Sequence, residues 1–379
     1  MKELVIRQKQ KKIDLNLAFL KKDLVLTISL TLAVISCFIH PPKWEYINFN
    51  VLISLFNLML VIKAFEDLKL LDKFAVAILN KCQESKRISA ILIFLCFFTS
   101  MFVTNDVALI SFVPLTLIIS KKTQLNMTKT IILQTIAANI GSSLTPMGNP
   151  QNLFIFSYYG IKPLQFLTTV LLMALVGISI LSFVIYRLKS KSIRVDLPVV
   201  RIVDRKKSSI WFLVFCIIVA SILGVISTRL AFIVTMVTAC FLDKKLLVKI
   251  DYLLLITFIS FFIFIGNLSS IDIVRIFARN HLNDTTSVFF GSILSSQFIS
   301  NVPASILLSK FTSDWKPLLV GVNIGGLGTI IASMASVISY KLFIQKNPGQ
   351  SKLYLTKFSI YNFSFLAFLT FIQYCVLKL

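Results

Sequence analysis

Apolar residues fill long stretches of this chain, and polar or basic residues interrupt them at short intervals. A helix needs about 20 predominantly apolar residues to cross the roughly 30 Å of hydrocarbon in a bilayer. Several stretches approach that length with few or no charged residues, which favours membrane-spanning helices over buried helices of a soluble protein. The expected spans are 24–39, 47–65, 164–186, 210–226, 230–242, 252–267 and 355–377.

Two other apolar regions have polar centres. Residues 88–120 form two apolar runs separated by the polar residues 104–106, and residues 288–311 form two runs separated by 300–303. Each run is too short to cross a bilayer alone. The simplest interpretation is a pair of re-entrant hairpins, each entering and leaving the membrane on one side with its polar tip at mid-membrane.

Two expected helices are broken by glycine, proline and polar residues. Residues 128–140 are apolar, 141–152 interrupt them, and 153–159 resume the apolar pattern. The region 318–343 behaves similarly, with an interruption at 324–328 and the helix expected to resume at Thr329. Backbone groups in such interruptions would lack hydrogen-bond partners in lipid, so both breaks are expected to line a protected cavity.

The interruptions also match one another in sequence. Residues 100–105 and 296–301 are similar, and the pattern N-I-G-x-x-x-T occupies both 139–145 and 323–329. In each half, an amphipathic segment expected to lie on the membrane surface precedes the hairpin. These surface segments are 66–86 and 271–282. The order span, surface helix, hairpin, broken helix and span therefore occurs twice.

This internal repeat defines the expected domains. Residues 1–46 contain a basic segment and the first span, 47–186 form repeat 1, 187–250 form a basic loop with two connecting spans, and 251–379 form repeat 2. An odd number of crossings separates the starts of the repeats, so the second should be inverted in the membrane. The expected fold is an all-α polytopic membrane protein with about nine full crossings, two re-entrant hairpins and two broken helices.

Composition and charge agree with this interpretation. The 379 residues are 56% hydrophobic and 15% charged, and their mean hydropathy is +0.85. The formal net charge of +23 lies mainly in short connections, which predicts a lipid bilayer with anionic headgroups as the partner and no nucleic acid. The positive-inside rule then places the N-terminus in the cytoplasm and the protein in the cytoplasmic (inner or plasma) membrane.

The sequence does not support several other kinds of function or site. The six cysteines stand singly and the two histidines are far apart, so neither a metal site nor a disulfide framework is expected. The Gly-rich residues 321–328 lack the Lys-Ser/Thr of a phosphate-binding loop. We therefore expect no organic cofactor, no nucleotide and no enzymatic activity.

The tips and breaks contain the candidate binding residues. Half-helix ends near the midplane can hold an anion with free N–H groups, whereas Asn and Ser/Thr oxygens and unwound carbonyls can hold Na⁺. An alternative is that these residues are ordinary helix caps and turns. The candidates are Thr104, Asn105, Asp106, Thr145, Gly148, Asn149, Asn152, Ser300, Asn301, Asn323, Gly325 and Thr329, with possible Na⁺ ligands at Asn105, Asn149 and Asn301. Structural prolines are expected at Pro146, Pro150 and Pro303.

Asp106 is the one acidic residue within the two hairpin segments, and repeat 2 has Val302 in its place. It could cap the second hairpin helix, carry a proton or bind a cation. A carboxylate beside an anionic substrate would repel it, so Asp106 favours a site that also binds a cation or a proton.

At these residues the chain resembles the citrate-transporter-like permeases of the ion transporter superfamily, a group related to divalent anion:sodium symporters and arsenite-efflux permeases. The similarity rests on 104–109, 139–152, 300–304 and 323–329 within a region of about 20–377. It implies a transporter with a mobile and a fixed region, an elevator-like motion and a homodimer. The tips Asn-Asp and Asn-Val-Pro differ from the Ser-Asn-Thr tips of the carboxylate symporters.

The leading hypothesis is a secondary active transporter for a small anion, a carboxylate or an inorganic oxyanion, coupled to Na⁺ or H⁺. One alternative is an arsenite-type efflux permease or a Na⁺/H⁺ antiporter-like exchanger that uses Asp106. An alternative of another class is a membrane scaffold or receptor that transports nothing. Loss of transport after substitution of Asn105 or Asn301 would distinguish the first two from the third.

Overall fold

The computed structural model describes residues 24–193 and 197–377, and the secondary-structure elements within them are all helices. The basic segment expected to lie in the cytoplasm, residues 1–23, lies outside the described residues. The helices are α1 (Leu24–Ile39), α2 (Phe49–Asp67), α3 (Leu70–Leu79), α4 (Ser85–Val103), α5 (Asn105–Thr123), α6 (Thr128–Ser142), α7 (Pro150–Tyr158), α8 (Pro163–Tyr186), α9 (Arg205–Ile222), α10 (Thr228–Leu242), α11 (Lys245–Lys249), α12 (Tyr252–Leu268), α13 (Asp272–His281), α14 (Thr285–Ile299), α15 (Asn301–Ser309), α16 (Trp315–Gly325), α17 (Met334–Lys346) and α18 (Ser351–Leu377).

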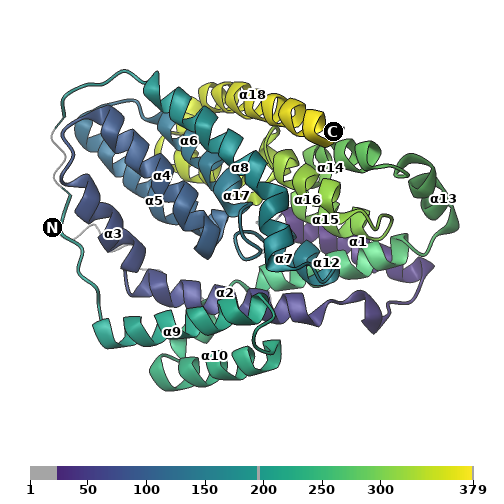
Figure 1. Cartoon of the computed structure of the whole chain (residues 1–379). Coiled ribbons are helices and arrows are strands. Elements are labelled where there is room, and N and C mark those ends of the chain that lie inside the picture. The colour runs from purple at the N-terminus through teal and green to yellow at the C-terminus, as the bar shows by residue number, and fades with distance from the viewer. Residues whose placement is uncertain (1–23, 194–196, 378–379) are drawn as a thin grey trace.

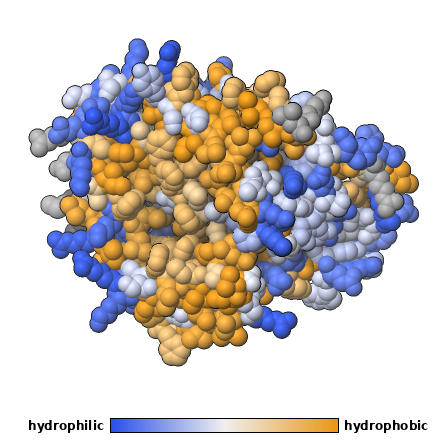
Figure 2. All heavy atoms as spheres, in the orientation of Figure 1, coloured by the Kyte–Doolittle hydropathy of each residue, from blue (hydrophilic) through white to orange (hydrophobic). Residues whose placement is uncertain are grey.

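The surface of the molecule has the polarity of a membrane protein. Figure 2 shows an apolar surface across its middle and hydrophilic residues gathered toward its left and right ends. In Figure 1, α2, α9 and α10 run along the direction that joins these two ends. Among the described residues, α2, α4, α8 and α18 are long and apolar enough to span a bilayer, and α12 with α13 adds a fifth span if this pair, bent by 91°, counts as one. The chain is therefore a polytopic membrane protein.

Each predicted hairpin consists of two helices joined by a single non-helical residue. The expectation that each apolar run is too short to cross a bilayer is wrong for the first hairpin, because α4 is long and apolar enough to span one. Thr104 separates α4 from α5, and Ser300 separates α14 from α15. The interruptions are shorter than the sequence suggested, because Asn105 and Asn301 are the first residues of the second helices. The polar residues of each tip therefore lie at a helix N-terminus.

The first broken helix also has a shorter break than expected. α6 continues to Ser142, and α7 begins at Pro150, where proline's missing N–H costs nothing. The Asn149 side chain caps α7 by accepting the Asn152 N–H at 2.9 Å. Helix capping therefore limits the unwound segment to residues 143–149.

The second break is longer than predicted. The expected restart of the helix at Thr329 is wrong, because α17 begins only at Met334, after a 3₁₀ turn (Ile330–Ala332). Both the N–H and the hydroxyl of Thr329 donate hydrogen bonds to Gln297, at 2.9 and 3.0 Å. These bonds hold Thr329 in an extended conformation against the second hairpin.

The predicted surface helix at 66–86 is also wrong in its extent. α2 continues to Asp67, Lys69 adopts a left-handed conformation, and α3 covers only Leu70–Leu79. Asn80 then exchanges two hydrogen bonds of 2.9 Å with the backbone of Leu197, which draws the chain away from the helix axis. Its counterpart in repeat 2, predicted at 271–282, is α13.

The two halves of the chain pack into one another reciprocally. Within each half the hairpin packs on its own broken helix, α4 against α6 and α14 against α16. Between the halves, α5 packs on α17 and α15 packs on α7, so the second limb of each hairpin contacts the broken helix of the other half. Likewise, α8 of the first half packs on α16 of the second, and α18 of the second half packs on α6 of the first. The expected inversion of the repeats stays a prediction, although the element order it requires is present.

Glycines permit the closest of these contacts. A Cβ on Gly141 would collide with the Phe97 carbonyl oxygen of α4, and a Cβ on Gly325 would lie 2.7 Å from Ser296 Cβ of α14. Both separations are shorter than a van der Waals contact permits. The two N-I-G motifs therefore bring each broken helix against its hairpin.

Candidate functional site

The two hairpin tips share an unusual backbone conformation. Thr104 has φ 77° and ψ 150°, and Ser300 has φ 74° and ψ 154°. Residues other than glycine rarely adopt this region, which costs on the order of 1–3 kcal/mol per residue, and such strain clusters at functional sites. Its occurrence at the same place in both tips indicates that the hairpin geometry itself is required.

Matched hydrogen bonds connect each tip to the break of its own half. The Thr145 hydroxyl donates to the Met101 carbonyl, three residues before the first tip. The Thr329 hydroxyl donates at 3.0 Å to the Gln297 carbonyl, three residues before the second tip. The threonine of each N-I-G-x-x-x-T motif therefore fastens the last turn of a hairpin limb.

Buried asparagines connect the two halves. Asn139 Oδ1 accepts hydrogen bonds from Asn105 Nδ2 at 3.0 Å and from Ser333 Oγ at 3.1 Å. The equivalent residue of repeat 2, Asn323, accepts from Asn149 Nδ2 at 3.1 Å. Asn139 and Asn323 occupy matching positions in the two repeats. The last residue of each break, Asn149 or Ser333, therefore contacts the motif asparagine of the other half. Each motif asparagine thus holds the opposite break in place.

Asn152 completes the first break. Its side-chain NH₂ donates to three backbone carbonyls of the unwound segment, those of Ser142, Ser143 and Thr145, each at 3.2 Å. Its Oδ1 accepts from Asn323 Nδ2 at 2.7 Å. One buried amide therefore satisfies backbone groups that an unwound helix would otherwise leave without partners.

A double-mutant cycle can test this connection. Asn149→Ala and Asn323→Ala should each lower the thermal stability of the detergent-solubilised protein. Because they remove the same hydrogen bond, the double variant should lose less than the sum, with a coupling free energy of about 1 kcal/mol. Asn80→Ala, which removes bonds elsewhere, combined with Asn149→Ala should give additive losses. Additive behaviour of both pairs would contradict the proposed connection.

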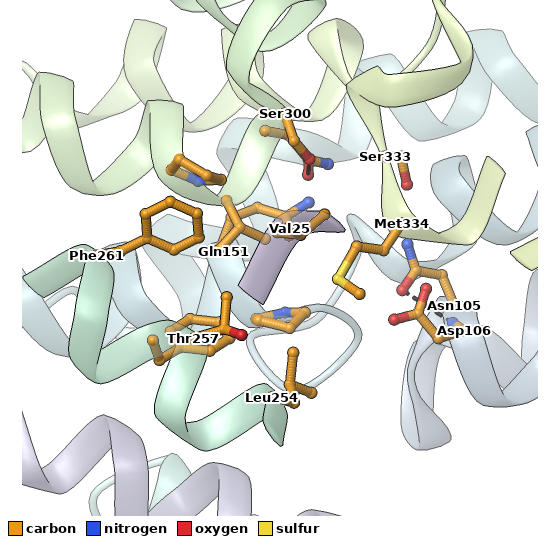
Figure 3. Close-up of a pocket in the computed structure, with 15 residues that line it drawn as sticks. Val25, Asn105, Asp106, Gln151, Leu254, Thr257, Phe261, Ser300, Ser333 and Met334 are labelled. Carbon is orange, nitrogen blue, oxygen red and sulfur yellow. Dashed lines mark hydrogen bonds between the residues drawn. The ribbon is translucent and has the colours of Figure 1, made fainter. Parts of the chain in front are cut away.

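Both tips line one partly open cavity with an empty volume of about 470 Å³, open space at its mouth included. Figure 3 shows Asn105, Asp106 and Met334 on one side of it, with Thr257 and Phe261 of α12 facing them. The polar residues of the wall are Asn105, Asp106, Gln151, Thr257, Ser300, Asn301 and Ser333. The other walls are apolar and include Val25 of α1, Phe258 and Pro303.

The two tips differ in the groups they present. At the first, Asn105 N–H donates to the Gly148 carbonyl and Asp106 N–H to Asn105 Oδ1, so the first two N–H groups of α5 have acceptors within the protein. Asp106 Oδ1 is buried and has no hydrogen-bond partner among the described residues. At the second, the Asn301 and Val302 N–H groups have no acceptor in this part of the chain. One tip therefore offers an unpaired carboxylate oxygen and the other offers unpaired N–H donors.

The structure separates the predicted site residues into two groups. Six line the cavity, namely Asn105, Asp106, Pro150, Ser300, Asn301 and Pro303. The others, Thr104, Thr145, Pro146, Gly148, Asn149, Asn152, Asn323, Gly325 and Thr329, do not line it and lie in the tips, breaks and adjoining helix ends around it. Sequence reasoning missed Gln151, Ser333, Thr257 and Met334 as lining residues. Ser333 aligns with Asn149 when the N-I-G motifs are superimposed, which is the signal that could have found it.

Two hairpins and two broken helices that bring polar tip residues to one cavity of an apolar helical protein define a membrane protein of the transporter class. The chain belongs to the citrate transporter family, whose sequence profile matches residues 4–338.

Individual relatives agree with this assignment. An uncharacterized transporter of Methanocaldococcus jannaschii is 38% identical over 309 residues, covering 80% of this chain and 84% of the relative. An inner membrane protein of Escherichia coli is 26% identical over 309 residues, covering 80% and 82%. A putative transporter of Dictyostelium discoideum, arsB, is 26% identical over 155 residues, which is 40% of this chain and 27% of the relative. The chain is therefore a membrane transporter of the citrate transporter and ArsB type.

Proposed function

We propose that this protein is a secondary active transporter that moves a small anion, a carboxylate or an inorganic oxyanion, across the cytoplasmic membrane together with Na⁺ or H⁺. The observation that carries the proposal is the chemical difference between the two tips at one cavity. The first presents the unpaired Asp106 oxygen, and the second presents the unpaired N–H groups at the start of α15.

The second tip suits the anion. The first N–H groups of a helix have no intrahelical acceptor and bear a partial positive charge, so they bind carboxylate or oxyanion oxygens. Asn301 and the Ser300 hydroxyl, both in the cavity wall, supply further polar contacts. Pro303, the third residue of α15, has no N–H group, so the free backbone donors at this tip are those of Asn301 and Val302.

The first tip suits the coupling ion. The Asp106 carboxylate and the Asn105 side-chain oxygen lie together in the cavity wall, and oxygen ligands of this kind hold hard cations. Protonation of Asp106 would serve the same electrostatic purpose, because either event cancels a negative charge near the anion. Binding of the anion at the second tip would then depend on binding of the cation or the proton at the first, because the positive charge offsets the repulsion between Asp106 and the anion.

An elevator-type alternating-access movement would involve the boundary between the hairpins and α12. The hairpins and broken helices interlock through the asparagine contacts described above, which suits a single moving body. On the facing side of the cavity, the residues contributed by α12 are Leu254, Thr257, Phe258 and Phe261. Among the described residues, the one polar contact of these side chains is the hydrogen bond from the Thr257 hydroxyl to the Leu253 carbonyl of the same helix, which sliding would not break.

The direct test is uptake into proteoliposomes containing the purified protein. Citrate, succinate, sulfate, phosphate and arsenite are offered in turn under an imposed Na⁺ gradient or an imposed pH gradient. The proposal expects accumulation of at least one anion that depends on one of the gradients. Flux that ignores both gradients would exclude coupling, and no flux of any anion would favour a cation exchanger or a scaffold.

Asp106 also supports a second candidate, an efflux permease or cation/proton exchanger. The observation that favours it is again the buried, unpaired Asp106 oxygen, which has no counterpart in the second hairpin. Proton release from energised vesicles on addition of Na⁺, without any anion, would distinguish this candidate from anion symport.

Asp106→Asn tests the role of the carboxylate in either case. Asparagine preserves the shape of the side chain and removes its charge, so the protein should fold normally. We expect transport to lose its dependence on the imposed ion gradient and to fall by about tenfold or more, corresponding to about 1.4 kcal/mol. Asp272→Asn, on the exposed α13, is the matched control. An Asp106→Asn protein with the gradient and pH dependence of the wild type would remove Asp106 from the coupling mechanism.

A further inference from the structure

A second hollow lies beside the cavity. It has an empty volume of about 750 Å³, open space at its mouth included, and is lined by the connection between α1 and α2 and the start of α2, together with Phe154, Tyr158, Phe262 and Lys310. The cavity is lined by other residues, among them Val25 of α1 and Leu254 of α12. We call this second hollow the vestibule.

The cavity and the vestibule follow one another along two helices. On α7, Gln151 lines the cavity, whereas Phe154 and Tyr158 line the vestibule. On α12, Phe261 lines the cavity and its neighbour Phe262 lines the vestibule. Both helices therefore contribute side chains to both spaces.

Three buried phenylalanines of α7 and α12 pack together where the two spaces adjoin. The ring centroids of Phe154 and Phe262 are 5.7 Å apart, and those of Phe258 and Phe262 are 6.3 Å apart. Each of these side chains is no more than 2% exposed. The vestibule and the cavity are thus separated by one layer of aromatic rings.

Lys310 is the basic residue in the wall of the vestibule. Its ammonium lies 5.1 Å from the centre of the Tyr158 ring, and it forms no ion pair within the residues that the structure describes. The acidic residue of the vestibule wall is Glu45, an exposed side chain. Lys310 directly follows α15, the helix whose first residues line the cavity. A partly buried ammonium without a carboxylate partner can gain a charge-assisted contact from a dissolved anion.

We propose that the vestibule is a second anion-binding site, in which Lys310 holds a carboxylate or an inorganic oxyanion before or after the anion occupies the tips. The proposal rests on the proposed anion transport, because it places this site on the route of the same substrate. Tyr158 positions the ammonium through its cation–π contact, and the phenylalanine layer keeps the vestibule separate from the cavity in this conformation.

Residue-resolved acetylation tests binding without requiring transport. The purified protein in vesicles of zwitterionic lipid is treated with an amine-acetylating reagent in citrate, sulfate or phosphate, or in chloride at equal ionic strength, and each lysine is followed by mass spectrometry. We expect at least one of the three anions to slow acetylation of Lys310 by about threefold, while Lys162, exposed and outside the vestibule, reacts equally in all buffers. Equal rates for Lys310 in every buffer would overturn the proposal.

Two further measurements complete the test. For an anion that the wild type transports, Lys310→Gln should raise KM by about fivefold, the equivalent of about 1 kcal/mol, and leave the maximal rate unchanged, whereas Lys162→Gln should change neither. Unchanged KM in Lys310→Gln would reject the site even if transport itself is confirmed, and absent flux in the wild type would reject the transport function instead. Protection of Lys310 by anionic lipid vesicles without added anion would assign it to a lipid headgroup and overturn the proposal.

Discussion

Gly141→Ala is expected to prevent accumulation of folded protein. The added Cβ would collide with the Phe97 carbonyl oxygen and lie 2.7 Å from Ser100 Oγ, and the first of these is helix backbone that cannot move without displacing α4. Overpacking at such a contact costs typically 1–3 kcal/mol and occasionally more, a large share of a protein's net stability of about 5–15 kcal/mol. Displacement of α4 would also separate the first hairpin from the first broken helix.

The measurement is the yield of monodisperse protein by size-exclusion chromatography, followed by thermal unfolding of whatever is recovered. Gly349→Ala is the matched control, because no atom lies within 4 Å of a Cβ at that position and its backbone is not left-handed. We expect Gly349→Ala to behave as the wild type. Normal yield and an unchanged midpoint for Gly141→Ala would show that α4 and α6 are not held as closely as described.

Asn105→Ala and Asn301→Ala are each expected to reduce transport by about 100-fold, corresponding to a loss of about 2.7 kcal/mol of binding free energy. Asn105 loses its bonds to Asn139 and to the Asp106 N–H, so the carboxylate is no longer held in place. Asn301 loses its contact with the Ser300 hydroxyl at the mouth of the second tip. Initial rates of uptake into proteoliposomes measure both effects.

Folding must be separated from function in these variants. Both asparagines are buried, so thermal unfolding should be measured on the same preparations. Asn283→Ala, on an exposed turn, provides a control that should transport normally. If stable Asn105→Ala and Asn301→Ala proteins transport at the wild-type rate, the tips are structural turns and the transport site lies elsewhere.

Sequence reasoning located the tips correctly because polar residues inside an apolar run are conspicuous. It could not predict that each turn consists of one residue, since Thr104 and Ser300 are not residues that normally adopt positive φ. Their conformation is imposed by packing and hydrogen bonds from the breaks, including the bond from Thr145 to Met101. Such tertiary constraints have no local sequence signal.

The ends of the broken helices illustrate a similar limit. The first break was expected to reach residue 152, but the Asn149 side chain caps α7 and the helix begins at Pro150. The second break was expected to end at Thr329, but the N–H and hydroxyl of Thr329 donate to Gln297 and the helix begins at Met334. Local composition therefore predicted that a break exists, and contacts with the hairpin determined its length.

The candidate site was predictable only in part for a related reason. The repeated motifs indicated Asn139 and Asn323, but hydrogen bonds across more than a hundred residues determine which break each one holds. Thr257 and Phe261 lie in the first span of repeat 2, outside the matched motifs, and no polar cluster in the sequence marks them. Only the three-dimensional arrangement brings them to the cavity.

The reciprocal packing of the hairpins has a consequence for synthesis of the protein. α5 ends at Thr123 and its partner α17 begins at Met334, so 334 − 123 = 211 positions separate them along the chain. At about 5–20 residues per second, the ribosome needs roughly 10–40 s to make the missing helix. During this interval Asn105 and Asp106 are in the nascent membrane protein without the neighbour that later covers them. The polar tip of the first hairpin therefore lacks this covering until α17 has been made.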